Sequence, residues 1–74
     1  MKRSSKTAMP IWLTESGERV SCIEKIKVMQ QNLEELQQMA QDTYEDGILM
    51  GIAQRQLKDF LVQLMDELYN PYEK

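Results

Sequence analysis

The stretch YEDGILMGIAQRQ, residues 44–56, contains two glycines within a sequence that otherwise predicts helix. If Gly47 ended the first helix, the apolar run around it would become a loop, and loops lie at the protein surface. If Gly51 is the C′ residue, Ile52 takes the C″ position, where a Schellman end favours an apolar side chain. We expect the first helix to end at Gly51. An end at Gly47 is the alternative. A glycine inside a helix costs about 1 kcal/mol relative to Ala, which predicts close packing at Gly47.

Apolar residues on both sides of this stretch recur with helical spacing. Upstream they alternate at intervals of four and three, as in a heptad seam: Cys22, Ile26, Met29, Leu33, Leu36, Ala40, Tyr44 and Ile48. Downstream they form a wide face of period 3.6: Ala53, Leu57, Phe60, Leu61, Leu64, Met65 and Leu68. Ser21 and Glu24 fit a capping box, and Pro71 limits the second helix. We expect a mainly α fold, an antiparallel helical hairpin with a long helix over about 21–50 and a shorter one over about 53–69.

The segment before the first helix has a different character. Residues 1–9 lack apolar periodicity and predict a disordered N-terminal tail, whereas residues 10–74 predict a single small helical domain. Strand-forming residues on either side of a Ser-Gly turn signal predict a short β-hairpin, with Pro10–Leu13 against Arg19–Ser21. An extended arm is the alternative. Either arrangement would lie on a helix face with Trp12 as its anchor, because an isolated two-stranded hairpin is marginal in water.

Composition and charge exclude several classes of function. The 74-residue chain has a net charge of −3, no histidine and one cysteine. Nucleic-acid binding would need a basic stripe, and a membrane-surface helix would need Lys and Arg on its polar face, so we expect neither kind of partner. Without histidine or a Gly-rich phosphate loop we expect no catalytic, cofactor-binding or metal-binding residues. One thiol and no apolar signal segment predict a cytoplasmic protein.

A chain of this size has little capacity to form its own core. A folded domain of about 60 residues buries only roughly 60% of the surface that its unfolded chain exposes. The longer expected helix also exceeds the shorter one by about 20 Å, so its N-terminal half lacks a partner. The N-terminal segment, a second copy or a different protein would have to cover that half. We expect a homo-oligomer, a dimer that assembles as a four-helix bundle.

These features predict a non-enzymatic protein–protein interaction module, such as a small adaptor, accessory subunit or regulator. Its mechanism would be the burial of apolar helix surface against a partner. The residues expected to form the interaction surface are Trp12, Met29, Leu33, Leu36, Leu57, Phe60, Leu64 and Tyr72. Three neighbouring acidic residues, Asp42, Glu45 and Asp46, form a candidate docking cluster for a basic partner.

Two alternative functions remain at this point. The acidic cluster, with Cys22, would suit a metal- or ligand-dependent small regulatory domain that binds through carboxylates. The second alternative is a small secretion-type chaperone, because helical hairpins of this size recur among such proteins. That analogy concerns the fold and says little about function.

Overall fold

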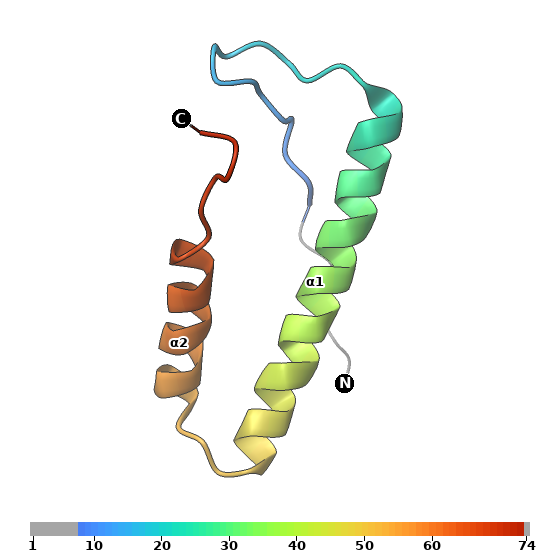
Figure 1. Ribbon diagram of the computed structural model, residues 1–74. Coiled ribbons are helices and arrows are strands. Elements are labelled where there is room, and N and C mark those ends of the chain that lie inside the picture. The colour runs from blue at the N-terminus through green and yellow to red at the C-terminus, as the bar shows by residue number, and fades with distance from the viewer. Residues whose placement is uncertain (1–7, 74) are drawn as a thin grey trace. The chain divides into compact units, whose positions relative to one another are not determined.

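The computed structural model describes residues 8–73, so most of the tail predicted at residues 1–9 lies outside the described residues. Two helices account for most of the described chain, α1 at Ile23–Leu49 and α2 at Gln54–Asp66 (Figure 1). The chain divides into two compact units, Met1–Gln38 and Met39–Lys74, with the boundary inside α1. Within residues 8–73, neither helix is long and apolar enough to cross a membrane.

The C-terminal end of α1 settles which glycine terminates the helix. Gly51 has φ +95°, in the left-handed region that a glycine adopts without steric cost. The Ile52 N–H donates to the Gly47 carbonyl at 2.9 Å, and the Gly51 N–H donates to the Ile48 carbonyl at 3.0 Å. These two bonds are the 6→1 and 5→2 pair of a Schellman motif. The prediction that Gly51 is the C′ residue is confirmed, and Gly47 lies inside the last turns of α1.

The short link after Gly51 returns the chain as α2, which packs against the last turns of α1. Ala53 occupies the N-cap with extended dihedral angles, and α2 begins at the next residue. Gly47 is the only buried residue among those described, and it lies next to Leu57 of α2. The helical hairpin is therefore confirmed, and so is the close packing that an internal glycine predicted.

The C-terminal end of α2 comes three residues earlier than the predicted position 69. The Leu68 N–H donates to the Met65 carbonyl at 3.2 Å, an i→i−3 bond that tightens the last turn. Downstream, the Tyr72 N–H donates to the Asn70 side chain at 2.8 Å. Such a local side-chain bond offers the backbone an alternative to the helix, and Pro71 keeps residue 70 out of the helical region.

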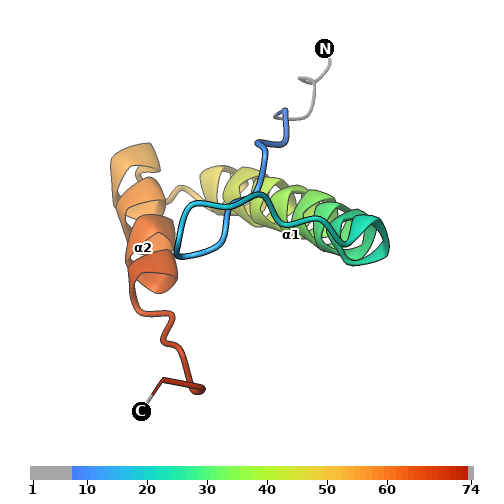
Figure 2. The ribbon, with the colours of Figure 1, turned by 90° about the horizontal axis from the view of Figure 1, so that it is seen from above.

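The N-terminal segment forms a bridged turn in place of the predicted strands. A single antiparallel bridge joins Leu13 to Arg19, and the Val20 N–H donates to the Trp12 carbonyl at 2.9 Å. No β-strand occurs within residues 8–73, so the predicted β-hairpin of Pro10–Leu13 against Arg19–Ser21 is not confirmed, and only the single bridge next to the turn is present. Figure 2 shows the chain doubling back at this turn.

The turn itself follows from its sequence. The Gly17 N–H donates to the Thr14 carbonyl at 2.9 Å, and Gly17 has φ +91°. The Thr14 N–H donates to the Glu18 carbonyl at 2.7 Å, which closes a three-residue loop with glycine at the left-handed position. The Thr14 hydroxyl accepts a further bond from the Glu18 N–H at 3.2 Å. The Ser-Gly signal therefore predicted the turn correctly.

The start of α1 lies slightly later than the capping-box pattern predicted. The Ile26 N–H donates to the Cys22 carbonyl at 3.0 Å, so Cys22 rather than Ser21 occupies the N-cap. The helix proper begins at Ile23. Cys22 is exposed, so the prediction that it packs in the apolar seam is wrong, because an N-cap residue precedes the packed turns.

No hydrophobic side chain within residues 8–73 is buried. The predicted seam of α1 instead divides into two lines, because residues three or four apart lie about 40–60° from each other around a helix of 3.6 residues per turn. Met29 and Leu36 lie on the exposed line. The other line is half-buried and consists of Ile26, Leu33, Ala40, Tyr44 and Ile48. Packing within the chain thus covers only one side of the apolar surface of α1.

Candidate functional site

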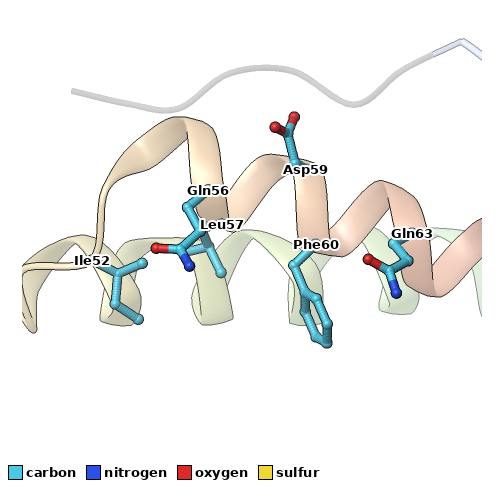
Figure 3. A pocket seen from close by; sticks show the side chains of 6 residues that line it. All are labelled: Ile52, Gln56, Leu57, Asp59, Phe60 and Gln63. Carbon is cyan, nitrogen blue, oxygen red and sulfur yellow. The ribbon is translucent and has the colours of Figure 1, made fainter.

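An apolar depression lies on the surface of the unit that spans residues 39–74. Its volume is about 590 Å³, and it is open to solvent along α2 (Figure 3). The residues that line it come from the interhelical link and from α2: Ile52, Gln56, Leu57, Asp59, Phe60 and Gln63. Three apolar side chains bordered by two amides make a surface on which an apolar side chain of another chain can rest.

The side chains of Ile52, Leu57 and Phe60 point to the same side of α2, and Asp59 points to the other side (Figure 3). Phe60 is 52% exposed, which leaves half of a large aromatic side chain in water. The carboxylate of Asp59 lies 3.5 Å from Arg55 Nη1, in an exposed i,i+4 pair. The floor of the depression is therefore apolar, and its charged residue faces a cation of its own helix.

The position of this surface depends on the contact between Gly47 and Leu57. A Cβ atom added at Gly47 would overlap Leu57 Cδ2, and it would lie 3.6 Å from Ile52 Cδ1. Glycine therefore lets α2 approach the backbone of α1 closely. Leu57 is half-buried by this contact and still contributes to the depression.

A second contact between α1 and α2 lies at the start of α2. The Tyr44 hydroxyl donates to Gln54 Oε1 at 3.3 Å, and Lys58 Nζ lies 5.5 Å from the centroid of the Tyr44 ring. Both interactions are exposed or partly exposed, so their contribution to stability is small. Both contacts lie beside the close approach of α2 to Gly47 and add to it only weakly.

The structure places the predicted interaction residues in different surroundings. Leu57 and Phe60 meet at the depression, and Leu64 lies one turn further along α2, 40% exposed. Met29 and Leu36 lie on the exposed line of α1, whereas Leu33 is half-buried. Tyr72 is 89% exposed in the C-terminal segment.

Trp12 is half-buried in the N-terminal segment. Its indole Nε1 is shielded from solvent and has no hydrogen-bond partner among the described residues. A buried donor that lacks an acceptor costs about 1–3 kcal/mol.

The acidic cluster lies on the exposed face of α1. Asp42, Glu45 and Asp46 are all exposed, and Glu45 Oε2 accepts a hydrogen bond from Gln41 Nε2 at 2.9 Å. Within residues 8–73, no three cysteine, aspartate or glutamate side chains come together in a group that could hold a metal ion. The cluster is thus an exposed acidic surface on α1.

Sequence reasoning missed part of the depression. It identified Leu57 and Phe60, but it assigned no surface role to Ile52 or to the amides of Gln56 and Gln63. The signal was present, because a Schellman end places an apolar C″ residue beside the start of the next element. Comparisons with protein-family models, with curated proteins and with solved structures find no match to this chain.

Proposed function

We propose that this protein is a non-enzymatic interaction module that buries its exposed apolar helix surface against another protein chain. The observation that carries the proposal is the absence of any buried hydrophobic side chain within residues 8–73. Burial of apolar surface is the dominant favourable term in folding and in most protein association. A chain that leaves this surface in water has most of that free energy still to gain from a partner.

The depression on α2 suits one recurring form of recognition. An amphipathic helix can place one apolar side chain against Phe60 while the amides of Gln56 and Gln63 bond to its polar edge. Aromatic residues are common at the centres of interfaces, where they contribute most of the binding energy. We expect Leu64, one turn further along α2, to extend the contact, and the acidic cluster to guide a basic partner by long-range attraction.

The assembled form that we propose is a homodimeric four-helix bundle, located in the cytoplasm. Small domains without disulfides or metals commonly gain stability by self-association. A four-helix bundle needs four apolar helix faces around one core, and two copies of this hairpin provide them. The module would act as an adaptor, accessory subunit or regulator, with its remaining exposed surface available to a further partner.

A photo-crosslinking residue placed at Phe60 tests the proposal in cells of the source organism. We expect covalent adducts with a protein chain, either a second copy or a different protein, because the side chain would lie in the buried centre of a contact. Asp66 is the matched control, since it is an exposed polar position of the same helix. Equal adduct yields at both positions, or none at either, would contradict the proposed function.

A further inference from the structure

A line of exposed residues runs along α1 beside its half-buried face. Successive members are three or four residues apart, which is the spacing of a coiled-coil seam: Met29, Asn32, Leu36, Met39 and Thr43. All five are exposed. Met29, Leu36 and Met39 are 48%, 46% and 68% exposed, respectively, so this exposed line retains much of its apolar surface in water.

The two ends of the exposed line carry opposite charges. Lys25 lies four residues before Met29, and Asp46 lies three residues after Thr43, so both continue the same spacing. Each charge is at the unfavourable end of its own helix, because the N-terminus of a helix carries partial positive charge and the C-terminus partial negative charge. Both residues are exposed.

An antiparallel second copy removes this conflict. Lys25 lies eleven residues before Leu36, and Asp46 lies ten residues after it. A two-fold axis at Leu36 therefore brings Lys25 of one copy beside Asp46 of the second copy. Each charge then also lies next to the favourable end of the neighbouring helix dipole. A parallel copy would instead place Lys25 beside Lys25 and Asp46 beside Asp46. The pair Lys25 and Asp46 is therefore complementary in only one of the two orientations.

We propose that a second copy of this chain docks antiparallel along the exposed line, with the two-fold axis at Leu36. Leu36 meets its own counterpart, Met29 meets Thr43 of the second copy, and Lys25 pairs with Asp46 of the second copy. The inference rests on the proposed function, because it names the partner and the orientation for one of the exposed apolar surfaces. The contact runs for about 30 Å along α1, given a rise of 1.5 Å per residue.

The polar members of the exposed line define its register. Asn32 and Thr43 weaken the contact relative to an all-Leu seam, and a polar residue at such a position favours one orientation over others. Asn32 lies four residues before the axis and Met39 lies three after it, so each Asn32 faces a flexible Met39 side chain of the second copy. Methionine adapts its shape to such neighbours. We therefore expect a reversible dimer with one register.

Single-cysteine variants test the position of the axis. In a Cys22→Ser background, Leu36→Cys should form a disulfide-linked dimer under mild oxidation, because only residues at the axis meet their own counterparts at disulfide distance. Met29→Cys is the matched control, since it lies on the same line but would face Thr43 of the second copy. Equal dimer yields from both variants, or no dimer from Leu36→Cys, would overturn the proposal.

Charge exchange tests the orientation without a covalent bond. By sedimentation of the full chain, Lys25→Glu or Asp46→Lys alone should weaken the dimer about fivefold to tenfold, because each creates two repulsive pairs. The double variant should return the dissociation constant to within about twofold of the native value, because every pair is attractive again. A native chain that sediments as a monomer at every concentration, or a double variant weaker than both single variants, overturns the antiparallel dimer. The crosslinking result expected at Phe60 does not depend on this dimer. The proposed function and the antiparallel dimer are therefore tested independently.

Discussion

Replacing Gly47 with Leu should separate α2 from the last turns of α1. A Cβ at this position already overlaps Leu57 Cδ2, and the larger side chain fills the space that Leu57 occupies. Overpacking of this kind costs about 1–3 kcal/mol. Leu is a strong helix former, and its advantage over Gly of about 0.8 kcal/mol offsets only part of that cost. We expect a net destabilisation of about 1 kcal/mol in urea unfolding followed by circular dichroism.

The control for this variant separates the effect on packing from the effect on the helix. Leu49→Ala changes an 85% exposed residue two positions away in the same turn, and we expect a change of less than about 0.5 kcal/mol. If Gly47→Leu stabilised the protein as helix propensity alone predicts, the close approach of α2 to Gly47 would be wrong.

Replacing Leu57 with Ala should be the second large change. A fully buried Leu→Ala substitution costs about 2–5 kcal/mol, and Leu57 is only half-buried, so we expect about 1–2 kcal/mol. Val62→Ala is the matched control on the same helix, since Val62 is 58% exposed and alanine favours the helix. Equal losses from the two variants would contradict the specific role of Leu57.

Leu57→Ala should also change the effect that Gly47→Ala has on stability. In the native chain Gly47→Ala forces the Leu57 methyl group to move, which cancels the gain in helix propensity. In the Leu57→Ala chain the methyl group is gone, so Gly47→Ala should stabilise the protein by about 1 kcal/mol. A double-mutant cycle of urea midpoints measures this coupling, and strictly additive effects would show that the two residues do not touch.

Local chemistry made several elements predictable from the sequence. Gly51 was identified as the end of α1 because Ile52 fits a Schellman end, and the two hydrogen bonds of that motif are present. The Ser-Gly turn was likewise correct, with Gly17 in the left-handed region. These signals depend on a few neighbouring residues, whose conformations are limited by backbone sterics.

Other features depend on contacts between distant residues and were less accessible. The seam of α1 was predicted as one surface, but packing within the chain covers Leu33 and leaves Leu36 exposed. Periodicity tells which residues share a broad face, and it does not tell how much of that face a neighbour covers. The predicted strands next to Leu13 were reduced to one bridge for a similar reason, because two short strands are stable only with further support.

The candidate site was predictable only in part. Phe60 and Leu57 followed from the apolar face of α2, but the depression also needs Ile52, whose place is set by the turn after Gly51. The exposed line along α1 was visible as a spacing pattern only after its half-buried neighbours were known. The function and the partner are proposals that rest on this exposed apolar surface.

Thermal unfolding of the purified chain over a wide range of concentrations tests most directly whether this protein needs another chain to complete its core. Helicity by circular dichroism should melt at a midpoint that rises with protein concentration, because association stabilises the folded form by mass action. At the lowest concentrations the transition should become broad, since a chain without buried hydrophobic side chains has little to make unfolding cooperative. A sharp transition at one fixed temperature across the whole range would contradict this, because it would mean that a single chain forms its own core.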